Sequence, residues 1–149
     1  MSLLKLNSTN ENLYKSKPYL YVKGMIVLSL ILLGFVYMFR DNCYDINNPY
    51  LTLFVGTAPN LIGSLLFTLV AIFSIVPILF SWNTIKKPFI VWFINIINIM
   101  FFGLIEHLHV IFKLGIWDNH DMVATFIGVL LATFAYYCLM FKGRGYSHE

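Results

Sequence analysis

The stretch GLIEHLHVIFKLGIWDNHDMVATFIG, residues 103–128, lies between two long apolar runs and contains many of the chain's ionisable side chains. It contains three of the four histidines and three of the seven acidic residues. Ionisable groups are costly inside a bilayer and are retained there for pairing or for function. We therefore expect this stretch to end one membrane helix, turn at the membrane surface and begin the next. Its ionisable groups are Glu106, His107, His109, Lys113, Asp118, His120 and Asp121.

The composition of the whole chain is that of a membrane protein. Of 149 residues, 59% are hydrophobic and 11% are charged, whereas soluble domains are about one quarter charged. So little polar surface cannot cover a soluble core, and we predict a single membrane domain over residues 1–149. No basic face interleaved with aromatic residues indicates a nucleic-acid partner. Cys43 and Cys138 are expected at opposite membrane faces, about 30 Å apart, too far for a disulfide.

Four apolar runs predict an all-α integral membrane four-helix bundle. The first run carries no small-x-small cleavage site after it, so it is interpreted as a retained span and not as a signal peptide. A polar tail precedes it, and Lys86-Lys87-Pro88 marks the loop before the third span. The predicted membrane helices cover about residues 22–40, 60–80, 88–112 and 121–141.

The apolar run 51–82 requires a break. As one helix it would extend roughly 48 Å at 1.5 Å per residue, longer than the hydrocarbon core of about 30 Å. Thr57 suits an N-cap and Pro59 the first turn of a helix. Residues 51–55 are therefore expected to form a broken, interfacial or re-entrant lead-in before the second helix. Pro77 is expected to kink that helix near its end.

The distribution of basic residues predicts the orientation of the bundle. Cytoplasmic loops of membrane proteins carry an excess of lysine and arginine. With both termini in the cytoplasm, only Arg40 and Lys113 lie on the outer side, together with most of the acidic residues. The chain is thus predicted to be a multi-pass cell-membrane protein. The basic residues on the inner side would be Lys5, Lys15, Lys17, Lys23, Lys86, Lys87, Lys142 and Arg144.

Polar and small residues recur at helical spacing on the second, third and fourth predicted helices, so each helix has one polar face. On the fourth helix, Gly128-x-x-x-Ala132 is a pattern that lets helices approach closely. The first helix has no comparable face and is placed at the periphery. The three polar faces comprise Thr57, Asn60, Ser64, Thr68 and Ala71; Asn95, Asn98, Phe102, Glu106, His109 and Lys113; and Asp121, Ala124 or Thr125, Gly128, Ala132 and Ala135.

These faces predict a polar cavity that opens outward between the second, third and fourth helices. Asn60, Glu106 and Asp121 fall at the outer ends of their helices, whereas Thr68, Asn98 and Gly128 share a layer about 12 Å deeper by helical rise. Another interpretation stays open, because amides and hydroxyls in membrane helices often contribute only interhelical packing, roughly 0.6 kcal/mol each. For Glu106 the alternative is an interfacial carboxylate paired with Lys113 or Arg40. The predicted ligand-binding residues are Asn60, Ser64, Asn98, Glu106, His109 and Asp121.

The residues of this outer cluster are compatible with several kinds of chemistry. Glu106-x-x-His109 has the spacing of a helical metal-binding pair, but bundle di-metal sites need two such motifs. His120 and Asp121 would have to complete a mononuclear site. We predict neither metal nor cofactor, since the chain also lacks a phosphate-binding loop and a serine nucleophile elbow. A Glu/His or Asp/His acid–base pair stays open, and Arg40 suits a phosphate or carboxylate. His107 points away from the polar face.

The segment IEHLHVIFKLGIWDNHDMVATFIGVLLA resembles the second half of VanZ-like membrane proteins. That family often shows Glu-x-x-Gln on a helix, a loop with glycine, an aromatic residue and aspartate, and a further aspartate near the next helix start. His109 stands where glutamine is usual, and Thr125 where asparagine is common. The resemblance covers residues 56–141. It runs through Thr57-Ala58-Pro59-Asn60, Glu106, His109, Gly115, Trp117-Asp118, Asp121 and Ile127-Gly128.

The resemblance implies a protein of the bacterial cell envelope, in a family associated with low-level teicoplanin resistance. Our leading hypothesis is a non-enzymatic protein that binds a membrane lipid or a lipid-linked cell-wall precursor in the polar cavity. One alternative is a membrane enzyme that acts on an outer-leaflet lipid, with Glu106 and Asp121 as acid–base groups or metal ligands. Another is a structural or immunity-type subunit of a membrane partner protein or of a homo-oligomer.

Overall fold

The computed structural model describes residues 17–46, 48–80, 82–113 and 118–142, and within these ranges the regular structure is entirely helical. Four helices in the described part are long and apolar enough to cross a membrane: Tyr19–Asp45, Pro49–Leu79, Pro88–Ile111 and Asn119–Met140. The prediction of an all-α, multi-pass membrane protein is confirmed at this level. The elements are α2 (Lys17–Asp45), α3 (Pro49–Val70), η1 (Ala71–Ile75), α4 (Val76–Leu79), α5 (Trp82–Ile85), α6 (Pro88–Ile111) and α7 (Asn119–Lys142).

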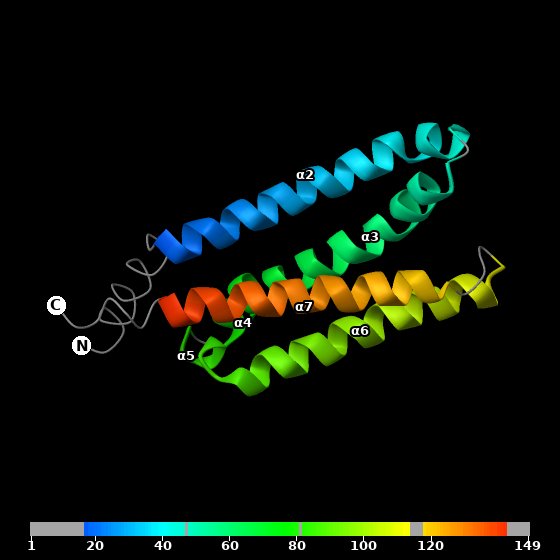
Figure 1. Cartoon of the computed structure of the whole chain (residues 1–149). Coiled ribbons are helices and arrows are strands. Elements are labelled where there is room, and N and C mark those ends of the chain that lie inside the picture. Colours follow the sequence, from blue (N-terminus) through cyan, green and yellow to red (C-terminus); the bar gives the residue numbers. More distant parts are fainter. Residues whose placement is uncertain (1–16, 47, 81, 114–117, 143–149) are drawn as a thin grey trace, which may run out of the picture.

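The long helices form an up-and-down bundle with α3 at its centre. The first turn of α2, the last turn of α7 and the short α5 lie at one end. The last turns of α2 and α6 and the first turns of α3 and α7 lie at the other (Figure 1). α3 packs against α7, α2 and α6, whereas α2 packs mainly against α3. The apolar core includes Leu69, Ile72, Val91, Ala132 and Tyr136. The Tyr136 hydroxyl donates a hydrogen bond to the Ile85 carbonyl at 2.6 Å and so ties α5 to α7.

The predicted start of the second membrane helix at Asn60 is wrong. α3 begins at Pro49, and the Asn48 side chain caps it by accepting hydrogen bonds from the amides of Tyr50 at 3.0 Å and Leu51 at 3.3 Å. An asparagine N-cap followed by proline is as strong a start signal as Thr57 and Pro59. Helix α3 continues through Pro59 without a break. How its first turns lie relative to a membrane stays a prediction.

Thr57 therefore lies inside a helix and not at its start. Its hydroxyl donates to the carbonyls of Leu53 at 3.0 Å and Phe54 at 3.4 Å, as hydroxyls inside helices commonly do. From Pro49 to Leu79 the element has 31 residues, about 46 Å at 1.5 Å per residue. This length exceeds a hydrocarbon core of about 30 Å, so one end extends into a polar layer or the helix tilts.

The distortion expected at Pro77 takes the form of a π-helical turn just before it. In η1 the amide of Val76 donates to the carbonyl of Ala71, five residues earlier. Proline has no N–H and its ring crowds the preceding turn, which accounts for a wider turn at this position. Ala71 and Ile72 are buried in the core, so the wider turn is packed on the inside of the bundle.

Helices α3 and α7 approach each other closely at Gly128. A Cβ atom there would overlap the Ser64 hydroxyl and the Leu61 carbonyl oxygen of α3. The Ser64 hydroxyl donates to the Thr125 carbonyl of α7 at 3.1 Å, and Ala132 is fully buried one turn further. The close approach predicted from the Gly128-x-x-x-Ala132 pattern is confirmed.

The outward faces of the bundle are rich in large apolar side chains. On α2 they include Ile31 and Phe35, and on α6 they include Trp92 and Met100, each more than half exposed. A soluble protein would not expose such continuous apolar surface, whereas lipid tails solvate it. The peripheral position predicted for the first helix agrees with its packing, since only 11% of its most apolar 18-residue segment is buried.

Candidate functional site

A cavity of about 750 Å³ lies at the end of the bundle where α2 and α6 end and α3 and α7 begin. Its volume falls in the range of small-molecule pockets. All four long helices contribute to it. Its lining is Tyr37, Arg40 and Tyr44 from α2; Pro49, Thr52, Leu53, Gly56, Thr57, Pro59 and Asn60 from α3; Glu106 and His109 from α6; and Asp118 and Asp121 beside and in the first turn of α7.

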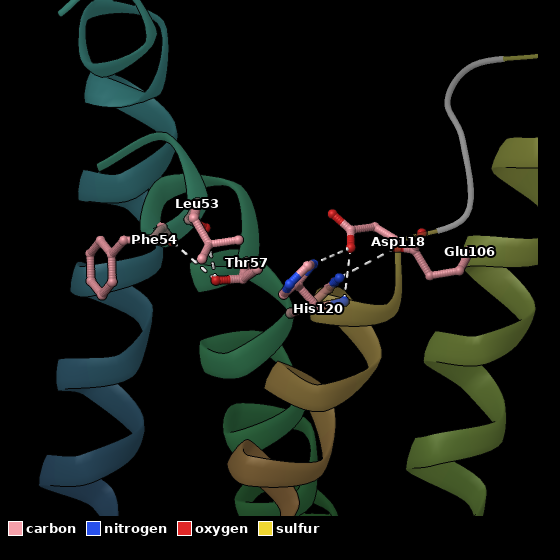
Figure 2. Close-up of polar contacts among 7 residues, drawn as sticks. Leu53, Phe54, Thr57, Glu106, Asp118 and His120 are labelled. Carbon is pink, nitrogen blue, oxygen red and sulfur yellow. Dashed lines mark hydrogen bonds and ion pairs between the residues drawn. The ribbon is translucent and has the colours of Figure 1, made fainter. Parts of the chain in front are cut away.

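Glu106 is the most deeply buried carboxylate of this cavity, with 6% of its surface exposed. Its side chain extends from α6 toward the first turn of α7 (Figure 2). The Asn60 side-chain amide of α3 donates to Glu106 Oε1 at 3.3 Å. The structure thus brings together two residues that the sequence placed at the same depth. In the described part of the chain, Glu106 forms no ion pair with Lys113 or Arg40.

Asp121 completes this carboxylate pair from α7. Its side chain lines the same cavity as Asn60 and Glu106. Asp121 Oδ1 is buried and has no hydrogen-bond partner within the described part of the chain. The cavity thus brings together two carboxylates on different helices, and the hydrogen bond from the Asn60 amide goes to Glu106.

The last turns of α2 supply the cation of the cavity. Arg40 Nε donates to the Tyr44 hydroxyl at 3.1 Å, and the guanidinium carbon lies 5.5 Å from the centre of the Tyr44 ring. Tyr37 lies one turn earlier on the same side of α2. Arg40 was a candidate from the sequence, whereas neither tyrosine was predicted. The sequence pattern needed to predict both tyrosines was present, because positions 37, 40 and 44 share one face of a helix.

Asp118 and His120, expected in a loop, instead form the start of α7. Asp118 Oδ1 accepts the His120 amide at 2.8 Å, an N-cap interaction, and lies 2.9 Å from His120 Nδ1 (Figure 2). The backbone hydrogen bond from His120, and then the one from its ring, hold the pKa of Asp118 below its ordinary value of 3.8. This pair fixes the helix start at the rim of the cavity.

Two of the predicted ligand-binding residues, Ser64 and Asn98, do not line the cavity. Both are fully buried deeper in the bundle. Asn98 Nδ2 donates to the Ser64 carbonyl at 2.7 Å and to Thr68 Oγ1 at 2.6 Å. The layer predicted for Thr68, Asn98 and Gly128 is therefore present, but the Asn98 N–H groups join α6 to α3, as the packing interpretation expects.

The two histidines of α6 also have different environments. His109 lines the cavity with an exposed side chain. His107 lies away from it, beside the α6 side chains Met100 and Leu104, as its helical position predicted. Among the described residues no three histidine, cysteine, aspartate or glutamate side chains are grouped to hold a metal ion. Gly115 and Trp117, which belong to the family resemblance, lie outside the described residues.

Comparisons with family models, with curated proteins and with solved structures find no match for this chain. Its function is therefore inferred from the cavity itself.

Proposed function

We propose that this chain is a membrane protein that binds the polar headgroup of an amphipathic molecule in the cavity lined by Arg40, Glu106 and Asp121. The observation that carries the proposal is a cavity of about 750 Å³ at one end of a bundle of span-length helices, with charged groups of both signs in its lining. Charged side chains at such a position are expensive to maintain and mark binding or transport paths.

The surroundings of the cavity suit a molecule that is polar at one end and apolar at the other. Leu53 and Pro59 contribute apolar surface to its wall. On α2, Met38 directly follows the cavity residue Tyr37 and is 77% exposed on the outer face of the helix. A headgroup can therefore occupy the cavity while its chains lie against apolar helix surface. Membrane lipids and lipid-linked cell-wall precursors consist of such a polar headgroup joined to apolar chains.

The orientation is part of the proposal. The cavity lies at the end that carries Arg40 and Lys113, opposite the end with Lys17, Lys86 and Lys87. By the positive-inside rule the cavity faces outward and both termini are cytoplasmic. The resemblance to VanZ-like proteins supports a location in a bacterial plasma membrane and a role in the cell envelope. In that setting the ligand is drawn from the outer leaflet.

The experiment fills the cavity without changing its charges. Gly56 lines the cavity, and an added Cβ would meet only the Tyr44 hydroxyl, at an ordinary 3.6 Å. Gly56→Phe places a ring in the cavity volume. Binding of dihexanoylphosphatidylethanolamine to the purified full-length chain in nanodiscs is measured by native mass spectrometry, and we expect Gly56→Phe to weaken it at least tenfold. The same spectra show whether the probe is chemically changed, as the enzyme alternative predicts.

Gly34→Phe is the matched control. Gly34 lies on α2, nothing lies within 4 Å of a Cβ atom added there, and it is not part of the cavity lining. This variant adds the same ring and should bind the probe like the wild type. Equal binding by wild type, Gly34→Phe and Gly56→Phe would show that the cavity is not the binding site.

A further inference from the structure

The charges that line the cavity do not balance among the described residues. Glu106, Asp118 and Asp121 face a single permanent cation, Arg40. Asp118 is paired with His120 at 2.9 Å, and Arg40 Nε is directed at the Tyr44 hydroxyl. This leaves Glu106 with one hydrogen bond, from the Asn60 amide, and Asp121 with no ion pair among the described residues.

The burial of Glu106, and of one oxygen of Asp121, makes the imbalance informative. Glu106 is more than nine-tenths buried, and its hydrogen bond from Asn60 is long at 3.3 Å. An ionised carboxylate has about four acceptor positions. Asp121 Oδ1 is buried without a donor from the described residues. Buried carboxylates are normally paired or fully hydrogen-bonded, so the cavity presents acceptor positions that a ligand can fill.

We propose that an ammonium group of the ligand binds between Glu106 and Asp121, so that the ligand is a cationic or zwitterionic amphiphile. This inference rests on the proposed function and names the class of ligand. An ammonium group offers three N–H donors and a compact positive charge, which match Glu106 and the unpartnered Asp121 Oδ1. The remaining guanidinium N–H groups of Arg40 suit a phosphate in the same molecule.

A metal ion fits this arrangement less well. Divalent cations in proteins take six or more oxygen ligands or a tetrahedral set that includes histidine or cysteine. The described part of the chain has no group of three such side chains. Tyr37 in the same cavity lining also favours an organic cation, because aromatic faces attract ammonium groups, whereas the Tyr44 ring already has Arg40 beside it.

The test varies the charge of the probe and of the protein separately. Dihexanoylphosphatidylethanolamine is compared with its N-acetyl derivative, which keeps the phosphate and both chains but has no cation. We expect the wild type to bind the amine at least tenfold more tightly than the N-acetyl compound. Glu106→Gln keeps the size of the side chain and removes its charge, and it should abolish this preference. Asp121→Asn is the second variant and should act in the same direction.

Asp41→Asn is the matched control, because Asp41 is an exposed α2 carboxylate near the same end of the bundle and is not part of the cavity lining. It should keep the full preference. A second measurement uses thermal unfolding without any probe. If Glu106 is an uncompensated buried charge, its removal in Glu106→Gln should raise the midpoint of thermal unfolding. If the carboxylate only holds the helices together, the same substitution should lower the midpoint.

The outcomes separate the two proposals. Equal binding of the amine and the N-acetyl probe by the wild type, still blocked by Gly56→Phe, overturns the ammonium site and leaves the binding function standing. If Gly56→Phe binds both probes as tightly as the wild type does, the proposed headgroup-binding function of the cavity is overturned. A third probe, ethanolamine phosphate without chains, distinguishes the source: tight binding that depends on Glu106 supports the ammonium site for a soluble ligand.

Discussion

At the scale of single residues, the polar side chains of this bundle have two different environments. Asn60, Glu106 and Asp121 lie around a cavity, and one buried oxygen of Asp121 has no donor among the described residues. Ser64 and Asn98 lie deeper, and the Ser64 hydroxyl and the Asn98 N–H group form hydrogen bonds between helices. Asn98 Oδ1 is likewise buried without a partner among the described residues. The same residue types at the same helical spacing thus line a cavity at one depth and join helices at another.

Gly128 provides the sharpest residue-scale prediction. Gly128→Ala puts a methyl group into the Ser64 hydroxyl and the Leu61 backbone carbonyl, so α3 and α7 must move apart. Overpacking of this kind costs about 1–3 kcal/mol. We expect a lower midpoint of thermal unfolding in detergent. Gly24→Ala is the control, since nothing lies within 4 Å of its added Cβ, and an equal loss in both variants would refute close packing at Gly128.

At the scale of elements, the helix starts decide which side chains reach the cavity. Because α3 begins at Pro49 and not at Asn60, seven of its residues reach the lining, including Thr52 and Gly56. Because α7 begins directly after Asp118, its first turn carries Asp121 toward Asn60. Caps formed by Asn48 and Asp118 hold both starts in place.

Asn48 and Thr57 offer a direct test of where α3 begins. Loss of an asparagine N-cap costs about 1 kcal/mol, so Asn48→Ala should lower the free energy of unfolding by that amount. Thr57→Val removes only hydroxyl bonds back to its own helix and should have a smaller effect. Chemical unfolding in mixed micelles measures both variants. A larger loss for Thr57→Val would favour a helix start at Thr57.

The cap of α7 should respond to acid. The pKa of Asp118 is held below 3.8 by the His120 amide and ring. Because the folded pKa is the lower one, the stabilisation by this carboxylate is present above about pH 4 and is lost as the pH falls through the folded pKa. The wild-type unfolding midpoint should therefore decline more steeply below about pH 4 than that of Asp118→Asn, whose amide keeps an acceptor oxygen and does not titrate. Parallel declines in the two proteins would contradict this role.

At the scale of the whole molecule, the bundle separates its charges between two ends. The end where α2 and α6 end and α3 and α7 begin holds the cavity, and the other end carries Lys86 and Lys87 beside α5 (Figure 1). This polarity is what a membrane protein needs to have one defined orientation.

The orientation is testable with single cysteines. On a background with Cys43→Ser and Cys138→Ser, Asp45→Cys marks the cavity end and Lys87→Cys the opposite end, and both positions are exposed. A membrane-impermeant thiol reagent added to intact cells should label Asp45→Cys alone. Lys87→Cys should react only after permeabilisation. The reverse pattern would place the cavity in the cytoplasm.

The sequence by itself determined the helical class, the number of membrane-length helices and which face of the second, third and fourth of them turns inward. These are properties of composition and of helical periodicity, and both are local. It also brought Asn60, Glu106, His109 and Asp121 to one end, because their positions along the helices fix their depth. The break expected at Thr57–Pro59 was wrong, because two equally good capping signals compete and tertiary packing decides between them.

Only the tertiary structure decided which polar residues border the cavity. Asn98 and Asn60 have the same amide and the same inward face, yet α3 and α7 meet tightly beside Gly128, and the Asn98 amide is taken up by α3. Toward the start of α7, α2 brings Arg40 and Tyr44 to the cavity wall. The separation between helices depends on side-chain volumes on all of them at once, so the pattern on one helix cannot specify it.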